Sequence, residues 1–336
     1  MKIAILTPTF SHYSGIDRVA ELQAVDYAEK GNEVTVMTLE STIRPKVFEL
    51  KILGMPKSLF MQRVYRLFFF LDFKKIRNAA EELKDYDLII SHFYPMNWIA
   101  SHAKKRYGIK YIYYNHGIGY SKLFGSFSEK FYMKLFSFFN KLSLKNADSA
   151  ISISKFMQSE LKKEIGMNSK VVYNKINSKR FKKNLDGGKI RKSLGLKQNE
   201  KLLLFVGRLS PHKNVHGLNE AFKLANEKNP SLRLLIIGRP TFNNYYKKLR
   251  SLANENVMFR DFVDDKELPY FYAASDLYTT ASLWEGFNLP AAEAQACGKK
   301  VVAFDVCSHP EIVKNGILVK ENDVNGFAKV ILKLLK

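Results

Sequence analysis

Two glutamates, Glu285 and Glu293, lie eight positions apart in the stretch TTASLWEGFNLPAAEAQACG. Residues 276–280 have the pattern of a buried strand, and Pro290 suits the first turn of a helix, where its missing N–H costs nothing. We therefore expect a turn at 284–288 whose amides, with the helix N-terminus, favour an anion. Glu285 would stay on this loop and Glu293 would project from the first turn of the helix. Two carboxylates that accept hydroxyl groups around an amide-bound phosphate suit a nucleotide sugar.

A second group of polar residues comes from the stretch GRLSPHK, in which Arg208 and Lys213 follow the apolar run LLLFV. Arginine offers a planar fork of donors and lysine a compact cation, and both groups neutralise phosphate oxygens. Taken alone, such a pair at a strand-to-helix turn would more often be surface charge. Beside the two glutamates, we interpret the pair as ligands of a leaving diphosphate.

The remaining candidate residues also follow strand-like runs. The segment 7–15 follows KIAILTP, His116 and Gly117 follow KYIYYN, and Gly238 follows LRLLII. Because ligands of open α/β sheets bind beyond the carboxyl ends of the strands, this recurrence predicts a shared binding region. Gly15 would let the backbone approach a phosphate closely, and a plain helix-start turn is the less favoured alternative. His12, His92 and Asn115 are weaker candidates for the acceptor side.

The length and composition of the chain indicate a globular protein with two domains. The chain has 336 residues, of which 46% are hydrophobic and 26% are charged. It has only two cysteines, which provides no disulfide framework. The N-terminus lacks the layout of a signal peptide, and no window is apolar enough for a membrane span. We therefore expect the protein to be cytoplasmic.

The net charge of +22 is unevenly distributed. Residues 41–145 contain 19 Lys/Arg against 7 Asp/Glu, whereas residues 201–336 contain 19 against 14. Within the more basic region, 61–77 and 129–145 interleave aromatic and apolar residues with cations at helical spacing. Such helices can lie at an anionic membrane surface, or they can be core helices with solvated lysines. No recognised motif supports nucleic-acid binding.

Strand-like runs and helical patterns alternate along the chain, which predicts βα units and parallel sheets. Helices are expected at 15–30, 59–84, 97–107, 127–145 and 154–165, with strands between them. The expected organisation is a Rossmann-like domain at 1–174 on the acceptor side, a linker with a short helix at 175–200, and a second Rossmann-like domain at 201–336 that binds the nucleotide sugar. Two such halves that face each other would enclose a cleft.

Several of these segments together resemble one known family. EGFNLPAAE is similar to the E-x7-E motif of retaining glycosyltransferases of the GT-B type, the group 1 glycosyl transferases. LLLFVGRLSPHKNVHGLNEAF, LRLLIIGRP, CGKKVVAF and SHPEIV resemble neighbouring segments of that family. The resemblance covers nearly all of the C-terminal half and, more loosely, the N-terminal half. It implies an α/β fold with two Rossmann-like domains that face each other across a cleft.

The resemblance also implies roles for individual residues. Arg208 and Lys213 would bind the diphosphate of the donor, Glu285 would lie near the sugar, and Glu293 would bind the ribose. His116 matches a family histidine near the donor sugar and acceptor. The turn residues Gly286, Phe287, Asn288 and Leu289 would complete the sugar and phosphate site, and Gly15 would belong to the phosphate loop of the first domain.

The chain departs from the family pattern at several turns. Asn288 stands where glycine is common, and asparagine tolerates positive φ better than most residues. One glycine, Gly15, is present where two are frequent. Lys175 and Asn177 replace the glycine and aspartate of the segment that enters the second domain. Asp261 also replaces a common glycine, so the nucleobase cannot be inferred from this segment.

Metal binding receives little support from the sequence. Asp85 and Asp87 mimic an Asp-x-Asp motif, but they begin the strand DLIISHF and so lie at the wrong end for a cleft of this fold. Asp264 and Asp265 are interpreted as an N-cap for a helix at 266–274. We expect no metal and no cofactor, with the diphosphate neutralised by Arg208, Lys213 and helix dipoles.

The combined hypothesis is a retaining hexosyltransferase that uses a nucleoside diphosphate sugar, with GDP-mannose and UDP-hexoses both compatible. Its acceptor would be a hydroxyl of a lipid-linked or cell-surface glycan, reached at the inner face of an anionic membrane. Nucleic acid is not an expected partner. A nucleotide-sugar hydrolase or epimerase of the same fold would instead consume donor without an acceptor. A non-catalytic sugar-nucleotide-binding protein would bind donor without turnover.

Overall fold

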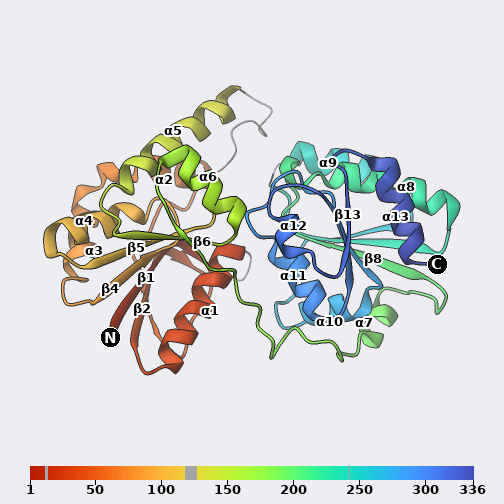
Figure 1. Cartoon of the computed structure of the whole chain (residues 1–336), viewed down its shortest axis with the longest axis horizontal. Coiled ribbons are helices and arrows are strands. Elements are labelled where there is room, and N and C mark those ends of the chain that lie inside the picture. Colours follow the sequence, from red (N-terminus) through yellow and green to blue (C-terminus); the bar gives the residue numbers. More distant parts are fainter. Residues whose placement is uncertain (12–13, 118–126, 242) are drawn as a thin grey trace. The chain divides into compact units, whose positions relative to one another are not determined.

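The computed structural model describes residues 1–11, 14–117, 127–241 and 243–336 (Figure 1). The chain divides into two compact units, Met1–Lys175 and Ile176–Lys336. Each unit is an α/β domain built on one parallel sheet. The expectation of two α/β domains with parallel sheets is therefore confirmed.

The first unit contains a seven-stranded sheet in the order β3-β2-β1-β4-β5-β6-β7. The strands are β1 (Lys2–Phe10), β2 (Glu33–Ser41), β3 (Glu49–Ile52), β4 (Leu88–Ser91), β5 (Lys110–Asn115), β6 (Ser149–Ser152) and β7 (Lys170–Val171). The central strand β1 is buried along most of its length, as its apolar run requires when both faces are covered. Sequence patterns did not indicate β3, whose residues are all partly or fully exposed.

The helices of this unit are α1 (Gly15–Glu29), α2 (Leu59–Leu67), the 3₁₀ helix η1 (Phe69–Leu71), α3 (Phe73–Glu81), α4 (Asn97–Tyr107), α5 (Phe127–Ser143) and α6 (Lys155–Ile165). The expectation of one long helix over 59–84 was wrong. Asp72 Oδ1 accepts a hydrogen bond of 3.1 Å from Lys75 N and so caps a new helix, α3. Helical periodicity continues through the break because apolar residues recur at helical spacing in both helices, although α2 buries only Gln62 and Leu67.

The second unit contains a six-stranded parallel sheet in the order β10-β9-β8-β11-β12-β13. The strands are β8 (Lys201–Val206), β9 (Leu232–Ile237), β10 (Val257–Arg260), β11 (Leu277–Thr280), β12 (Lys300–Phe304) and β13 (Gly316–Val319). Along β8, Leu203 and Phe205 join one apolar cluster while Leu202 and Leu204 join another. The sheet therefore has a core on both faces, which explains the unbroken apolar runs of its strands.

The helices of the second unit are α7 (Gly188–Ser193), η3 (Pro211–Lys213, a 3₁₀ helix), α8 (Val215–Lys228), α9 (Asn243–Leu252), α10 (Leu268–Ala274), α11 (Leu289–Ala296), α12 (His309–Ile312) and α13 (Val324–Leu334). The expected N-cap of α10 was wrong. Glu267 holds that position, whereas Asp264 Oδ1 accepts from Lys266 N and Asp265 forms an ion pair with Arg180.

The segment 176–200, which sequence patterns describe as a linker, packs onto the second unit. Ile176, Leu185 and Ile190 contact the apolar cluster on one face of its sheet. Arg191 Nη1 also donates to Asp276 Oδ2 at 3.1 Å, at the start of β11. Low sequence periodicity in this segment thus reflects an irregular backbone that is nevertheless anchored.

Strand order in each unit reverses at one point, and this point locates the expected binding edge. In the first unit, β1 to β3 run to one side of the sheet and β4 to β7 to the other. In the second unit, β8 to β10 and β11 to β13 diverge in the same way. Ligands of open α/β sheets bind outside the carboxyl ends of the strands at such switch points. Arg208 follows β8 and Glu285 follows β11, so both lie at the switch point of the second unit.

Candidate active site

Glu285 and Glu293 are both buried, with 6% and 4% of their surface exposed. Glu285 lies in the irregular segment between β11 and α11, as expected. Glu293 is the fifth residue of α11, just past the first turn in which it was expected, because the helix begins one residue before Pro290. Two buried carboxylates in one loop and helix are costly unless each has a partner. The structure supplies a different partner for each of them.

The partner of Glu285 is Lys213. Lys213 Nζ lies 2.7 Å from Glu285 Oε1, with only 17% and 8% of the two side chains exposed. Two further bonds hold the backbone of this region in place. Leu283 N donates to His212 O at 2.9 Å, and Ser308 Oγ donates to Glu285 O at 3.0 Å. The loops after β8, β11 and β12 are therefore tied together around this ion pair.

The ion pair determines the charge state of Glu285. Burial is the largest single effect and favours the neutral acid, but Lys213, through its charge and its hydrogen bond, acts together with His309 and Ser282 to lower the pKa of Glu285. Burial, Lys213 and Arg208 together lower the pKa of His212 to about 4, against the opposing effect of Glu285. These four side chains thus interact electrostatically and form one cluster. Glu285 in this cluster is a carboxylate, suited to accept hydroxyl groups and to stabilise a developing cation.

The partner of Glu293 is Tyr272 on α10, whose hydroxyl donates to Glu293 Oε2 at 2.8 Å. The two glutamates also approach a common residue, Tyr278 on β11. Burial raises the pKa of Tyr278 well above its usual range, and Glu285 and Glu293 both raise it further. The structure therefore brings together the two carboxylates and the two cations singled out in the sequence, Arg208 and Lys213.

Asn288 is the N-cap residue of α11 and has a left-handed backbone, with φ 64° and ψ 67°. The tolerance of asparagine for positive φ is therefore used here. Its Oδ1 accepts from Ala291 N at 3.2 Å, and its Nδ2 donates to His309 Nε2 at 2.9 Å. His309 Nδ1 in turn donates to Phe304 O at 2.7 Å. Because both polar atoms of the Asn288 side chain are occupied, a diphosphate would meet its backbone amide.

The neighbours of Asn288 in the turn are also well enclosed. Gly286 and Phe287 are buried, and Leu289 is the first residue of α11 and half-buried. Pro290 occupies the second position of the helix, as its missing N–H favours. The positive end of the helix dipole therefore faces the same loop that carries Glu285.

In the first unit, Gly15 is the first residue of α1 and lies beyond the carboxyl end of β1. A carboxylate missed in the sequence, Asp17, anchors this loop. It is 1% exposed and accepts hydrogen bonds from Ser11 N at 3.0 Å, Ser11 Oγ at 2.9 Å and Thr9 Oγ1 at 3.1 Å. Burial raises the pKa of Asp17 to about 7, although these bonds lower it. The hydroxyls of Thr7, Thr9 and Ser11, spaced by two along one strand face, were the available sequence signal.

His116 belongs to a chain of three buried or partly buried side chains. Gln23 Oε1, on α1, accepts a hydrogen bond of 2.9 Å from His92 Nε2. His92 Nδ1 must then accept the 2.9 Å bond from His116 Nε2. This order of donors leaves Nδ1 as the unprotonated nitrogen of His116. Burial lowers the pKa of His116 to about 3 and that of His92 well below its usual range, where the charge of His116 adds to burial.

This histidine pair predicts a specific dependence of stability on pH. Both pKa values are lowered from 6.5 in the folded state, so the unfolded state binds protons first as pH falls. The two neutral histidines contribute to the free energy of unfolding above pH 6.5. This contribution is lost as pH falls from 6.5 to about 3. When pH falls from 6.5 to 5, we expect the free energy of unfolding of the wild type to fall by about 3 kcal/mol more than that of the double variant His92→Gln/His116→Gln.

Denaturant unfolding followed by Trp98 fluorescence, in a Trp284→Phe background, reports on the first unit. Asp17 acts in the opposite direction, because its raised pKa stabilises the folded state as pH falls from 7 towards 3.8. The double variant should therefore lose less stability than the wild type on acidification, or gain some. Equal pH slopes for the two proteins would contradict the neutral, buried pair.

Other residues singled out in the sequence have structural roles or lie elsewhere. Asn115 donates to Met157 O at 3.0 Å and accepts from Gly117 N at 3.0 Å, so it shapes the turn after β5. Asp87 Oδ2 accepts from Lys2 N at 2.7 Å at the amino end of the sheet. Asn177 Oδ1 accepts from Lys179 N at 3.1 Å in the segment that enters the second unit. His12 lies outside the described residues.

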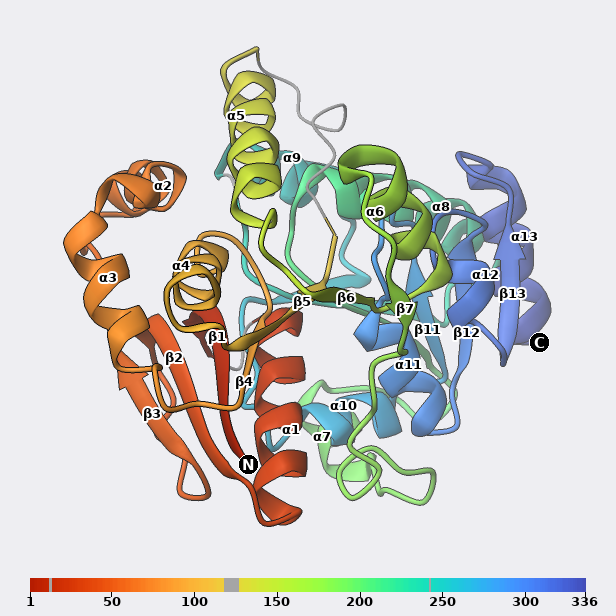
Figure 2. The same ribbon diagram turned by 60° about the vertical axis from the view of Figure 1, so that its left-hand side comes forward.

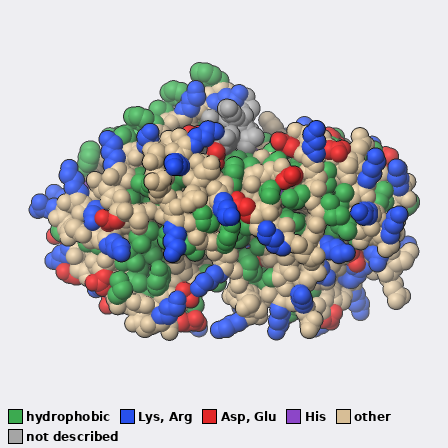
Figure 3. Space-filling view, viewed as in Figure 1, with side chains coloured by type: hydrophobic (Ala, Val, Ile, Leu, Met, Phe, Trp, Pro, Cys, Tyr) green, Lys and Arg blue, Asp and Glu red, His purple; other side chains and the backbone are tan. Residues whose placement is uncertain are grey.

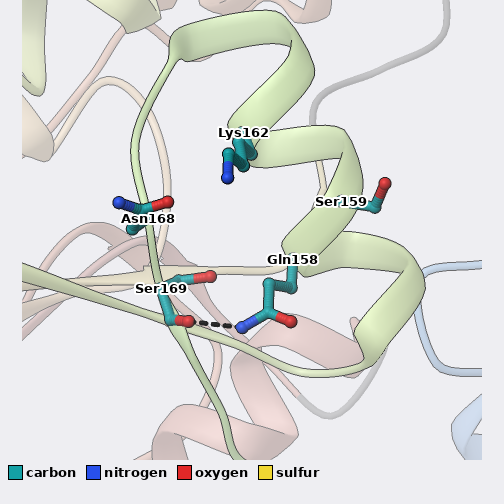
Figure 4. Close-up of a pocket in the computed structure, with 5 residues that line it drawn as sticks. All are labelled: Gln158, Ser159, Lys162, Asn168 and Ser169. Atoms are coloured by element: carbon teal, nitrogen blue, oxygen red, sulfur yellow. Dashed lines mark hydrogen bonds between the residues drawn. The ribbon is translucent and has the colours of Figure 1, made fainter.

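A small pocket of about 310 Å³ lies between α6 and the segment before β7 (Figure 4). It is lined by Gln158, Ser159, Lys162, Asn168 and Ser169. Gln158 Nε2 donates to Ser169 O, and most of the lining is exposed. None of the site residues expected from the sequence contributes to this pocket.

Comparison with known proteins identifies the family of the chain. The family model of group 1 glycosyl transferases matches residues 186–336, and that of Glycosyltransferase Family 4 matches residues 13–180, half of the chain. The chain belongs to the group 1 and family 4 glycosyltransferases. Within the part of the chain that the structure describes, no helix is long and apolar enough to cross a membrane.

Three similar proteins show how far the likeness extends. The O-antigen chain mannosyltransferase B of Escherichia coli is 33% identical over 138 residues, which cover 40% of this chain and 36% of that protein. Sucrose-phosphate synthase from Thermosynechococcus elongatus has a TM-score of 0.82 at 21% identity, over 99% of this chain and 89% of that one. HepE from Anabaena, in complex with UDP and glucose, has a TM-score of 0.81 at 21% identity, over 100% and 90% of the two chains.

The two structural likenesses establish the fold, which is that of GT-B glycosyltransferases. The chain spans 36%, 64% and 37% of the length of the first three curated relatives that it matches. Activity, substrates and partners are therefore treated below as a proposal.

Proposed function

We propose that the protein is a retaining glycosyltransferase, which moves a hexosyl unit from a nucleoside diphosphate sugar to an acceptor hydroxyl. The observation that carries this proposal is that Arg208, Lys213 and Glu285 of the cluster lie near Glu293 at the switch point of the second unit. Membership of the family supports it. GDP-mannose and UDP-hexoses are the donors to test, since one relative is named as a mannosyltransferase and one structural neighbour binds UDP and glucose.

In this proposal the cations act on the leaving group. Departure of the sugar leaves negative charge on the diphosphate and oxocarbenium character on the ring. Arg208 is exposed and can offer its donor fork to one phosphate. Lys213 can approach the other phosphate while it stays paired with Glu285. The diphosphate is then neutralised by these residues and the dipole of α11, with no divalent ion or cofactor.

Each of the other groups has a distinct task. Glu285, held as a carboxylate by Lys213, accepts sugar hydroxyls and stabilises the ring cation, with Gly286 and Phe287 beside it. Glu293, oriented by Tyr272, accepts the ribose hydroxyls. His116 acts at the transferred sugar and is positioned by His92 and Gln23. Because Glu285 is paired with Lys213 and is assigned to the ring cation, the leaving phosphate oxygen takes the acceptor's proton in this proposal, on the same face of the sugar and with retention.

The acceptor in this proposal is a lipid-linked or cell-surface glycan. Support comes from the O-antigen relative and from the excess of cations in the first unit. The expected location is cytoplasmic, at the inner face of the membrane. Incubation with radiolabelled donors and membrane extracts, followed by analysis of the anomeric configuration of the product, tests both transfer and retention. Donor breakdown without any acceptor would instead indicate a hydrolase.

The assignment of the diphosphate site predicts the effect of one substitution. Arg208→Ala is expected to lower kcat/KM for the donor at least tenfold, ~1.4 kcal/mol of transition-state stabilisation, because one charged donor to the leaving group is lost. Steady-state kinetics at saturating acceptor measure this. Arg106→Ala on α4, an exposed arginine of the first unit, is the matched control and should leave kcat/KM unchanged. Equal kinetics for both variants would remove Arg208 from the site.

A further inference from the structure

Large hydrophobic side chains are exposed together on two segments of the first unit. Of the 17 such side chains exposed in the described part of the chain, nine belong to these segments: Leu59, Phe60, Met61, Phe68, Leu71, Phe73, Phe127, Phe131 and Phe138. Phe127 is 85% exposed and Phe60 is 71% exposed. Single exposed hydrophobic residues are ordinary, whereas a group of this size marks an interaction surface. These nine side chains are called the apolar face below.

The two segments lie side by side. The rings of Phe70 and Phe139 have centroids 4.5 Å apart, and those of Phe68 and Phe139 are 6.1 Å apart. Tyr132 on α5 also donates from its hydroxyl to Arg63 O on α2, at 3.4 Å. Figure 2 shows α2 and α5 at the same end of the first unit. The apolar face is therefore one feature of the tertiary structure, although its residues come from two parts of the sequence.

On α5 the exposed residues follow the geometry of an amphipathic helix. With 3.6 residues per turn, Phe127, Phe131 and Phe138 fall within an arc of about 40°. Lys130 and Lys134 fall beside this arc, and both are exposed. The opposite side of the helix packs on the unit through Phe136, which is buried against Tyr94. A row of phenylalanines bordered by lysines suits the boundary between lipid headgroups and acyl chains.

Cations dominate the surroundings of the apolar face. Residues 57–77 and 127–145 together contain ten Lys/Arg and two Asp/Glu. Eight of the ten cations are exposed, namely Lys57, Arg63, Lys74, Arg77, Lys130, Lys134, Lys141 and Lys145. Figure 3 shows green side chains along the protruding part that Figure 1 identifies as α5, with blue cations among them. A second copy of the chain would bring the same excess of positive charge against this face, which disfavours self-association.

We propose that the apolar face docks on an anionic lipid bilayer, with its phenylalanine and leucine side chains inserted among the headgroups and the surrounding lysines and arginines on lipid phosphates. Charge complementarity selects this partner, since each cation near an anionic surface adds attraction and the aromatic residues add apolar burial. Docking through exposed side chains requires no rearrangement of the core of the unit.

The position of this face gives the docking a consequence for the reaction. Residues 53–58, which lead into α2, follow the carboxyl end of β3. The N-terminus of α5 comes after β5 along the chain, as does His116. The bilayer would thus lie towards the edge of the sheet that carries His116, where a lipid-linked acceptor would arrive. This consequence rests on the proposed function, whereas the docking itself does not.

Vesicle sedimentation of the whole protein tests the proposal. The wild type should sediment with vesicles of phosphatidylcholine and phosphatidylglycerol at low salt, and at least tenfold more weakly with phosphatidylcholine alone. Phe131→Ser/Phe138→Ser and Lys130→Gln/Lys134→Gln should each weaken binding at least tenfold. Leu252→Ser on α9 and Lys329→Gln/Lys333→Gln on α13 are matched exposed controls in the second unit, and they should bind as the wild type does.

Three results would overturn the docking. The wild type could fail to bind anionic vesicles at low salt. The phenylalanine variant could bind as tightly as the wild type. Binding would then depend on charge alone, with no insertion of apolar side chains. Sedimentation velocity without lipid could show a dimer that the phenylalanine variant abolishes, which would make the face a self-interface. Thermal shifts with GDP and UDP separate this test from the proposed function: vesicle binding without nucleotide binding would sustain the docking and refute the transferase.

Discussion

Lys213→Met is expected to lower the free energy of unfolding of the second unit by about 3 kcal/mol, because it leaves the buried carboxylate of Glu285 without its cation. The pair lies with 17% and 8% of its side chains exposed, so solvent cannot replace the lost interaction. Catalysis should suffer as well. Loss of a cation that acts on the leaving diphosphate is expected to lower kcat/KM about 100-fold or more.

The pH dependence of this variant distinguishes a lost ion pair from general damage. Without Lys213, burial remains the largest effect on Glu285, opposed by His309 and Ser282, so we expect the pKa of Glu285 to lie above the unfolded value. The folded state then binds a proton before the unfolded state does, so stability rises as pH falls. The deficit relative to the wild type should therefore be smaller at pH 5 than at pH 8. Denaturant unfolding followed by Trp284 fluorescence, in a Trp98→Phe background, measures it.

Two further variants serve as controls for Lys213. Lys213→Met/Glu285→Gln should regain most of the lost stability, because the uncompensated charge is gone, while its activity stays low. Lys223→Met removes an exposed lysine from α8 and should change stability by less than about 0.5 kcal/mol. If the single variant were as stable as the wild type at pH 8, the pair would have no part in holding the loops together.

Gly238→Ala is expected to destabilise the second unit by about 3 kcal/mol and to weaken nucleotide binding at least tenfold. A Cβ at this position would lie 1.8 Å from the carbonyl oxygen of Gly207. The oxygen belongs to the backbone and the position of the Cβ is fixed by the backbone of residue 238, so the strand end itself must move. Gly207 directly precedes Arg208, and its amide donates to Ile237 O at 3.0 Å. A shift of this strand end therefore displaces the cation proposed for the diphosphate.

Thermal unfolding with and without nucleoside diphosphate measures both effects of Gly238→Ala. For the wild type, a ligand at 100 times its Kd adds ~2.7 kcal/mol of stability. Gly54→Ala in the first unit is the control, because nothing lies within 4 Å of its added Cβ and only the strain of its positive φ, about 1 kcal/mol, is expected. A Gly238→Ala protein with wild-type stability and nucleotide binding would show that the close approach to Gly207 is unimportant.

Much of the fold could be predicted from the sequence because its signals are local. The apolar run at 202–206 is a buried strand whichever residues cover it, and the residues 97–107 form a helix at the bounds that their periodicity indicates. Pro290 and the left-handed Asn288 fix the start of α11 through local backbone preferences and the bond from Ala291 N to the Asn288 side chain. Periodicity failed at 59–84, where the side chain of Asp72 starts a new helix without interrupting the apolar pattern.

The candidate site was only partly visible in the sequence. Phosphate and hydroxyl binding were indicated by the residue types of Arg208, Lys213, Glu285 and Glu293 and by their positions after strands or in the helix that follows. Their partners were not visible, because Tyr272 and His309 are far from Glu293 and Asn288 in the sequence and have no distinctive neighbours. Asp17 was likewise missed, since a single acidic residue in a helix usually indicates a solvated surface.

By itself the sequence determined which residues are polar at the carboxyl ends of strands, and hence the chemistry that this edge can perform. Only the tertiary structure decided the protonation states: Lys213 lowers the pKa of Glu285, and Gln23 fixes which nitrogen of His92, and through it of His116, carries the proton. It also joined two separate segments into the apolar face. The physical reason is that burial and charge–charge interaction depend on distances in space, whereas spacing along the chain sets only local conformation.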